Sequence, residues 1–310
     1  MRIFKLILVI AIMIAIVVGL KVYEKNQDVQ NVNNEVQNKE ESNQEDDKAE
    51  DETNTNIDEN IEQDDKTEQE NIPEDDGIPK YLKSEKDIRI PILLYHHFVE
   101  ANPPVDMYSI VSTPERFEEH LVGLIEAGYT FITVEELVRY NKNELALPEK
   151  VIVLTLDDGW LSNYTMAFPI FKKLNIKATI FVVDDLVGTN DYFTWEQAKE
   201  MIESGLIAIQ THGKSHIHYE NQKNAKLVED IEYAHGVIEE KLGKKVEKIF
   251  AYPYGTSTDA GRKALQELGY TQMLTTKAVN MSNNLNMSRL ARIYIYHNYT
   301  VKQILNLIEK

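Results

Sequence analysis

The chain has 310 residues, no cysteine and a formal net charge of −18. The lack of cysteine excludes disulfide scaffolds, cysteine nucleophiles and thiolate metal sites, so any metal must be held by nitrogen and oxygen ligands. Residues 24–76 contain 21 acidic and 4 basic residues, and the first 23 residues carry +3, which leaves −4 for residues 77–310. A nearly neutral remainder without a basic stripe argues against a nucleic-acid partner.

Residues 1–23 are predicted to be an N-terminal membrane anchor or signal. Arg2 and Lys5 precede an unbroken apolar run, residues 6–20, which Lys21 closes. With its apolar flanks the segment reaches about 20 residues, enough for a helix to span a bilayer. No A-x-A-like cleavage site follows, which favours an uncleaved anchor over a cleaved signal peptide. In both cases the basic residues stay cytoplasmic and the remainder of the chain is exported.

Residues 24–80 are predicted to form a disordered acidic linker. The segment has no aromatic residue and is dominated by Asn, Gln, Glu and Asp. Such a composition cannot bury enough apolar surface to offset the entropy of ordering, and repulsion between like charges favours an extended chain. The linker would hold a folded domain away from the membrane, or it is a solvated tail without a role.

Residues 88–310 are predicted to form one α/β domain, because short apolar stretches alternate with segments of helical periodicity. Seven or eight such units predict a parallel sheet and a (β/α) barrel, complete or incomplete. An open doubly wound sheet is the alternative. The predicted strands are residues 90–95, 130–132, 151–156, 178–183, 207–210, 248–252, 270–275 and 292–296. The predicted helices cover residues 134–140, 164–174, 195–203, 225–242, 259–268 and 301–308, and an earlier one runs from about Thr113 to Gly128.

Polar residues follow three of the predicted strands at their carboxyl ends, where barrel enzymes place catalytic groups. The first cluster is Thr-Leu-Asp-Asp-Gly at residues 155–159. Adjacent carboxylates at a strand end point in different directions, so one of Asp157 and Asp158 could ligate a metal while the other faces a substrate. The alternative is an ordinary turn, since Asp and Gly are common turn residues.

The second and third clusters supply imidazoles and a tight turn. His212 and His216 stand four residues apart, a spacing that would place both on one side of a helical turn and suit one metal ion. His218 is a possible competitor, and a chance pair is the alternative. The third cluster, residues 250–255, brackets a turn with Pro and Gly that could present a backbone N–H. One Asp and two His form a facial ligand set with open positions, and a neighbouring carboxylate could act as a general base.

The three clusters resemble motifs of the polysaccharide deacetylase family, which is carbohydrate esterase family 4 and shares the NodB homology domain. TLDDG at residues 155–159 is similar to the family's T-F-D-D-G motif, HGKSH at 212–216 to its H-x3-H motif, and AYPYG at 251–255 to its R-P-P-Y-type motif. The likeness covers about residues 88–310. It implies a distorted (β/α) barrel and a divalent metal ion, with zinc as the first expectation.

Position by position, the resemblance assigns a role to each motif residue. Asp157 becomes the catalytic base. Asp158, His212 and His216 become the metal ligands, and the backbone N–H of Tyr254 helps to hold the oxyanion. Imidazole and carboxylate ligands also suit cobalt, nickel and iron, so the ligand set does not fix the metal.

The sequence departs from the family pattern at two places. The motif Arg is Ala251 here, and Arg289 and Arg292 are the candidates for orienting Asp157. The late L-x-H motif, whose His is the family's usual general acid, has no match near the C-terminus, and the surroundings of His297 do not fit it.

The first predicted strand resembles an exported branch of the family that deacetylates poly-N-acetylglucosamine. PILLYHH at residues 91–97 and STPERF at 112–117 carry this likeness. That branch also tends to lack the late His and the motif Arg, and it carries a Tyr-His at the end of the first strand. The resemblance therefore makes His96 the candidate general acid, with His97 as the alternative. A buried structural His pair is the other interpretation.

The resemblance implies a metal-dependent hydrolase that removes N-acetyl groups from N-acetylglucosamine units of a cell-surface polysaccharide. Poly-N-acetylglucosamine and peptidoglycan are the candidate substrates, and the first strand favours the former. The alternatives are a non-catalytic carbohydrate-binding relative and an esterase that acts on O-acetylated polysaccharide. The expected location is the cell membrane, single-pass, with the catalytic domain on the extracytoplasmic side, or outside the cell if the N-terminus is cleaved.

Overall fold

The computed structural model describes residues 89–107, 109–276 and 287–309. The predicted anchor, 1–23, and the predicted linker, 24–80, lie outside these residues. Within the described part of the chain, no helix is long and apolar enough to cross a membrane.

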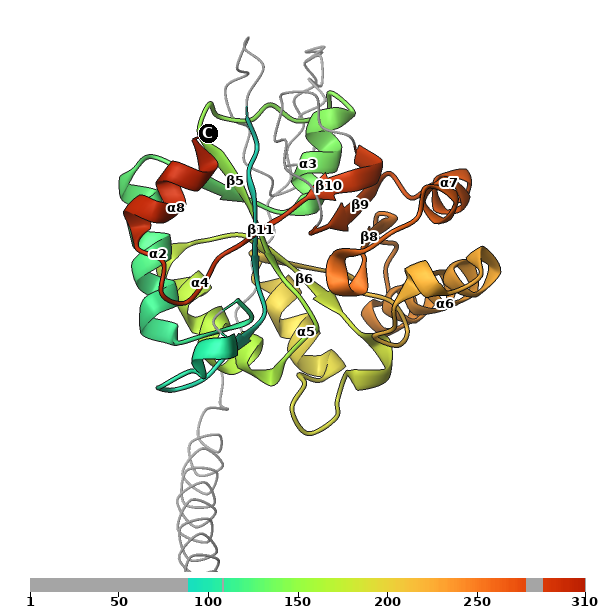
Figure 1. The fold of residues 1–310 in the computed structure, drawn as a ribbon, viewed down its shortest axis with the longest axis horizontal. Coiled ribbons are helices and arrows are strands. Elements are labelled where there is room, and N and C mark those ends of the chain that lie inside the picture. The colour runs from blue at the N-terminus through green and yellow to red at the C-terminus, as the bar shows by residue number, and fades with distance from the viewer. Residues whose placement is uncertain (1–88, 108, 277–286, 310) are drawn as a thin grey trace, which may run out of the picture. The chain divides into compact units, whose positions relative to one another are not determined.

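Nine strands in the described residues form one parallel sheet that curls into a nearly closed barrel (Figure 1). The strands are β1 (Ile92–Tyr95), β4 (Thr130–Ile132), β5 (Val151–Leu156), β6 (Ala178–Val182), β7 (Ile207–Thr211), β8 (Ile249–Ala251), β9 (Gln272–Thr275), β10 (Leu290–Ala291) and β11 (Ile293–Tyr294). Their order is β10-β9-β8-β7-β6-β5-β1-β11, and β4 pairs with the first half of β5. Every predicted strand is present, and its ends differ from the prediction by no more than two residues.

The last two strands nearly close the barrel and rule out the open doubly wound sheet. β10 pairs with β9, and β11 pairs with β1 at the other end of the strand order. A single residue, Arg292, joins the two strands, and its backbone N–H donates to Thr275 of β9 at 3.0 Å. Ile295, just beyond β11, donates to Leu94 of β1 at 3.2 Å. A short stretch of chain thus passes from one end of the sheet to the other at Arg292.

Alternate residues of each strand face the inside of the barrel, as the period of two in a strand requires. One buried cluster joins residues from strands that are far apart in the order, which shows that their inner faces meet. From the strands and the residues next to them it includes Ile90, Ile92, Ile132, Val151, Val153, Phe181, Ile249, Ala251, Leu274 and Leu290. Val134, Leu137 and Val138 of helix α3 (Val134–Asn141) belong to the same cluster, so α3 fills part of the interior.

The remaining α-helices surround the strands (Figure 1). They are α2 (Pro114–Glu126), α4 (Phe168–Leu174), α5 (Trp195–Glu203), α6 (Asn224–Leu242), α7 (Asp259–Glu267) and α8 (Val301–Ile308). Threonine side chains cap the N-termini of α2, α3, α5, α7 and α8, since each hydroxyl accepts a backbone N–H of the first turn. Short helical turns are η2 (Val105–Met107), η3 (Asn163–Ala167), η4 (Asp184–Leu186), η5 (Tyr219–Asn221), η6 (Pro253–Gly255) and η7 (Met287–Arg289), and a separate pair of strands, β2 (His97–Phe98) and β3 (Val111–Ser112), follows β1.

The predicted helix over residues 164–174 is divided in the structure. Its first part is the π-helical turn η3, and α4 follows it directly. Pro169 stands at the start of α4, where it has no backbone N–H to continue a regular ladder of hydrogen bonds. The helical periodicity was therefore visible in the sequence, but the widened turn was not.

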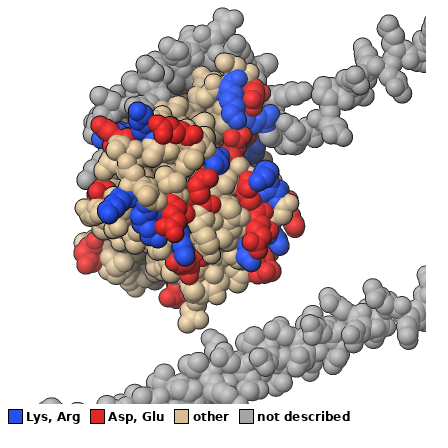
Figure 2. Space-filling model, turned by 90° about the vertical axis from the view of Figure 1, so that its right-hand side faces the viewer, with Lys and Arg blue, Asp and Glu red and all other residues tan. Residues whose placement is uncertain are grey.

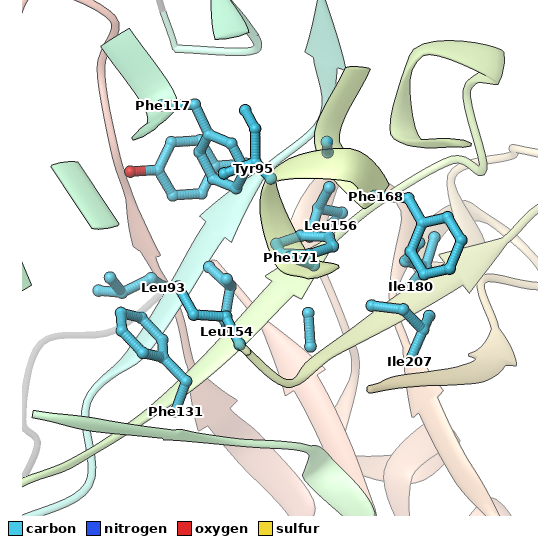
Figure 3. Packing of buried hydrophobic residues seen from close by; sticks show 14 of the residues in the cluster. Leu93, Tyr95, Phe117, Phe131, Leu154, Leu156, Phe168, Phe171, Ile180 and Ile207 are labelled. Carbon is cyan, nitrogen blue, oxygen red and sulfur yellow. The ribbon is translucent and has the colours of Figure 1, made fainter. Parts of the chain in front are cut away.

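Outward-facing strand residues pack against the helices and form the largest buried cluster. Figure 3 shows Tyr95 of β1 beside Phe117 of α2 and Leu156 of β5 beside Phe171 of α4. The face that carries α6 and α7 has basic and acidic side chains in small interspersed groups (Figure 2). This agrees with the nearly neutral charge of residues 77–310.

Candidate active site

The candidate site lies at the carboxyl ends of β1, β5 and β7. His96 follows β1, Asp157 follows β5 and His212 follows β7. Each of the three continues the inward-facing alternation of its strand, and their side chains meet. His212 Nε2 lies 3.6 Å from Asp157 Oδ2, and His96 Nε2 lies 4.0 Å from the same oxygen.

Three predicted ligands converge on one point. Asp158 Oδ1 lies 3.5 Å from Nε2 of His212 and 3.4 Å from Nε2 of His216, and the candidate ligand atoms of the three residues lie within 4.8 Å of one another. Asp158 Oδ1 is buried and has no hydrogen-bond partner among the described residues. Nδ1 of His212 lies 2.7 Å from the carbonyl oxygen of Ala251, so Nδ1 carries the proton and Nε2 offers a lone pair.

This donor set fits a divalent cation. An uncompensated carboxylate oxygen is costly to bury, and one carboxylate with two imidazoles is a common ligand set for zinc and similar metals. The hydrogen bond from His212 to a backbone carbonyl is the outer contact that metal-binding histidines usually make.

The histidine pair lies on a loop, so the predicted helical turn is wrong. β7 ends at Thr211, and Gly213 then adopts a left-handed backbone with φ +94°. A Cβ at Gly213 would lie 2.6 Å from the hydroxyl of Tyr219, so the loop also needs the missing side chain. The reversal at Gly213, rather than helical periodicity, brings the His212 and His216 rings to a centroid distance of 5.2 Å.

The two adjacent carboxylates diverge, as their sequence predicts. Asp158 has φ +75°, a left-handed conformation that is uncommon for a residue with a side chain. It turns its carboxylate toward the histidines, and its Oδ2 accepts a hydrogen bond from Trp160 Nε1 at 2.9 Å. Trp160 was not among the residues that the sequence singled out, because nothing in the spacing of Asp158 and Trp160 shows that their side chains meet.

Asp157 turns the other way and pairs with Arg292. Arg292 Nη1 donates to Oδ1 at 2.5 Å and Nη2 donates to Oδ2 at 2.6 Å, so Arg292 rather than Arg289 orients Asp157. Burial by itself raises the pKa of Asp157, but the positive charge of Arg292 and the neighbouring His212 outweigh it and hold the pKa at about 2. Asp157 is therefore ionised at neutral pH.

Replacing Arg292 with leucine is expected to lower the free energy of unfolding by about 3–5 kcal/mol, because it leaves a buried carboxylate unpaired. Urea titration at neutral pH measures the loss. In the wild type this contribution should disappear as the pH falls from the ordinary pKa of 3.8 toward about 2, since the folded-state pKa is the lower one. Adding Asp157→Leu should recover much of the loss. The exposed Arg289→Leu is the matched control, and an equal loss in that variant would contradict the assignment.

The structure separates the two histidines that follow β1. His96 points to Asp157, and its ring lies parallel to that of Tyr294, with an interplanar angle of 3° and centroids 5.9 Å apart. Burial lowers the pKa of His96, while the negative charges of Asp157 and Asp158 oppose the shift. His97 belongs to β2, and its Nδ1 lies 2.9 Å from the hydroxyl of Ser162. The geometry therefore favours His96 as the group that can exchange a proton beside Asp157.

Tyr254, on the turn η6, lies beside the predicted ligand His216. Its backbone is left-handed, with φ +59°, and the residue is 46% exposed. The ring meets His216 edge-on at 4.5 Å and stacks on His218 at 3.6 Å. His218 therefore packs on Tyr254 and is not one of the converging ligands. The role of the Tyr254 backbone N–H as an oxyanion donor stays a prediction.

His297 contacts a different part of the domain. Its Nδ1 lies 3.3 Å from the hydroxyl of Ser112, on β3. The structure thus gives no counterpart of the L-x-H histidine at this position, in agreement with the mismatch in the sequence.

Residues 144–273 match the family model described as "Polysaccharide deacetylase". Residues 144–273 thus carry a polysaccharide deacetylase domain. Enzymes of this family are hydrolases that remove acetyl groups from sugars, and the converging side chains of this domain are suited to that reaction.

Individual relatives agree with this assignment. YxkH of Bacillus subtilis (strain 168), named as a polysaccharide deacetylase, is 28% identical over 221 residues, which cover 71% of this chain and 76% of the relative. The poly-beta-1,6-N-acetyl-D-glucosamine N-deacetylase of Staphylococcus aureus (strain MSSA476) is 27% identical, with 68% of this chain and 80% of the relative covered. The solved structure of the Streptococcus pyogenes deacetylase PplD in complex with acetate superposes with a TM-score of 0.65 at 27% identity, over 72% of this chain and 99% of that one.

Proposed function

We propose that this chain is a metal-dependent N-deacetylase of poly-N-acetylglucosamine at the cell surface. The observation that carries the proposal is the convergence of Asp158, His212 and His216 beside an ionised Asp157 that Arg292 holds in one orientation. Relatives named as poly-beta-1,6-N-acetyl-D-glucosamine N-deacetylases support the choice of substrate. The position of His96 at the end of β1 agrees with the resemblance to the same branch.

The proposed reaction is hydrolysis of the acetamide bond. Asp158, His212 and His216 would hold a divalent metal, which would supply a Lewis acid and lower the pKa of water. Asp157 removes a proton from the attacking water while the water oxygen bonds to the acetyl carbonyl carbon. The bidentate contact with Arg292 keeps the Asp157 carboxylate from rotating away during this step.

The other two residues act on the atoms that change charge. The backbone N–H of Tyr254 donates to the carbonyl oxygen as negative charge develops there. His96 donates a proton to the sugar nitrogen while the carbon–nitrogen bond breaks. Acetate and a free amino sugar are the products. Because burial lowers the pKa of His96, its protonated form depends on the nearby negative charge of Asp157.

The function is tested by incubating the purified full-length chain with β-1,6-linked N-acetylglucosamine oligomers, and measuring acetate release and oligomer masses. Peptidoglycan fragments and an O-acetylated xylan serve as comparison substrates. We expect acetate from the oligomers, loss of activity with a chelator and recovery on adding a divalent metal. Activity that survives exhaustive chelation would contradict metal dependence. Acetate from peptidoglycan alone or from xylan alone would contradict the substrate.

The location is a proposal that rests on the sequence. An apolar segment within residues 1–23 would anchor the chain, and residues 24–80 would carry the catalytic domain, residues 88–310, to an extracytoplasmic polymer. Fractionation of cells that produce the full-length chain tests this, with protease added to intact cells. We expect the protein in washed membranes and sensitive to protease. Recovery from the cytosol would contradict the proposal, and a shortened protein in the medium would indicate a cleaved signal.

A further inference from the structure

The two carboxylate oxygens of Asp158 have different surroundings. Oδ1 faces the two ligand histidines and has no hydrogen-bond partner among the described residues. Oδ2 accepts a hydrogen bond from Trp160 Nε1. The indole N–H is a donor only, so Trp160 can hold a carboxylate oxygen but cannot compete with it for a cation.

The indole of Trp160 packs against two other rings. The ring of Tyr192 stacks on it at a centroid distance of 4.7 Å and an interplanar angle of 22°, and the ring of His97 lies at 4.6 Å with a tilt of 44°. An isolated antiparallel bridge joins the backbones of Trp160 and Tyr192. The hydroxyl of Ser162 accepts the backbone N–H of Phe98 and lies 2.9 Å from His97 Nδ1, which fixes the His97 ring.

We propose that Trp160 is a positioning residue that leaves a single oxygen of Asp158 free for the metal, and that His97 and Tyr192 hold its indole in place. The inference rests on the proposed metal-dependent function. It also gives His97 a role different from that of His96, since His97 acts on the carboxylate through Trp160.

The neighbouring carboxylate shows why one occupied oxygen matters. Arg292 occupies both oxygens of Asp157, so that carboxylate is withheld from the metal and kept as a base. Trp160 occupies one oxygen of Asp158, so the other is available. Two adjacent aspartates thus acquire different roles from the number of donors that each receives. Asp158 has a left-handed backbone, so its side chain lacks the usual orientation of a residue at a strand end. The hydrogen bond from Trp160 therefore contributes to holding the Asp158 carboxylate in its orientation.

The test uses the full-length chain and measures zinc binding by equilibrium dialysis after removal of metal. Trp160→Phe keeps an aromatic ring against His97 and Tyr192 but removes the N–H. Loss of an outer partner of a ligand typically costs 10–100-fold in metal affinity, and we expect a Kd raised by about that factor. The matched control is Trp195→Phe. Trp195 begins α5 and packs against the outer core, and its replacement should leave the Kd unchanged.

Tryptophan fluorescence gives a second measurement that a merely structural role would not change. The chain has two tryptophans, so in Trp195→Phe the emission comes from Trp160 alone. We expect zinc to shift or quench this emission with the same Kd as in dialysis, because the metal withdraws charge from the carboxylate that accepts the indole N–H. Tyr192→Leu keeps the indole N–H and removes the ring that stacks on Trp160. It should weaken zinc binding less than Trp160→Phe does.

The outcomes separate this inference from the proposed function. Wild-type affinity in Trp160→Phe, or a Trp160 emission that does not respond to zinc, would overturn it while metal dependence stands. If Trp160→Phe does not fold, Tyr192→Leu and the emission titration decide, and unchanged values in both would overturn the inference. A wild-type chain that binds no zinc would overturn both proposals.

Discussion

Replacing any one of Asp158, His212 and His216 with alanine is expected to remove most of the bound metal and to lower turnover by at least about 1000-fold. The candidate ligand atoms of the three residues lie within 4.8 Å of one another, so each replacement removes one of the three converging donors. Loss of a Lewis acid costs several kcal/mol of transition-state stabilisation, and each 1.4 kcal/mol is a factor of ten in rate. Metal analysis of the purified variants and acetate release from N-acetylglucosamine oligomers measure the two effects.

His218→Ala is the matched control for the ligand variants. His218 belongs to the same loop as His216, but its Nδ1 lies 3.1 Å from a carboxylate oxygen of Glu220 and its ring stacks on Tyr254. We therefore expect His218→Ala to keep the metal. Full metal occupancy in the alanine variants of all three ligands would contradict the ligand assignment. Loss of metal in His218→Ala alone would indicate that His218, rather than His216, binds the metal.

The sequence was sufficient to predict the barrel and the convergence of Asp158, His212 and His216, because both depend on local patterns. Alternating apolar strands and periodic helices identify the fold, and polar residues at the ends of parallel strands must share one rim. The alternation within β1 could also have separated the two histidines. His96 has the same parity as the inward-facing Ile92, whereas His97 has the parity of the outward-facing Leu93.

Three features of the site depend on backbone geometry and long-range contacts that residue spacing does not reveal. The left-handed conformation of Gly213 replaces the expected helical turn. The choice of Arg292 over Arg289 follows from the point at which the last strands pass from β9 to β1. The contact of Trp160 with Asp158 depends on the left-handed backbone of Asp158. In each case the sequence shows the residue, but not its backbone conformation or the direction of its side chain.

His96→Ala is expected to lower turnover by about 100- to 10,000-fold, the usual contribution of proton transfer by a side chain. The metal content should stay at the wild-type level, because His96 contacts Asp157 and is outside the ligand group. Acetate release at saturating metal measures the turnover, and metal analysis of the same preparation measures occupancy.

Two further variants distinguish a general acid from other roles at this position. Asp157→Asn should also keep the metal, since Asp158, His212 and His216 are intact, yet it should lose turnover because an amide cannot accept the proton of water. His97→Ala should keep turnover close to the wild-type value once metal is saturating, because His97 faces Ser162 and Trp160 rather than Asp157. If His97→Ala loses turnover under these conditions while His96→Ala keeps it, the roles of the two histidines are exchanged. If neither variant loses turnover, the amine receives its proton from another group, and the resemblance of β1 to the poly-N-acetylglucosamine branch does not extend to the acid.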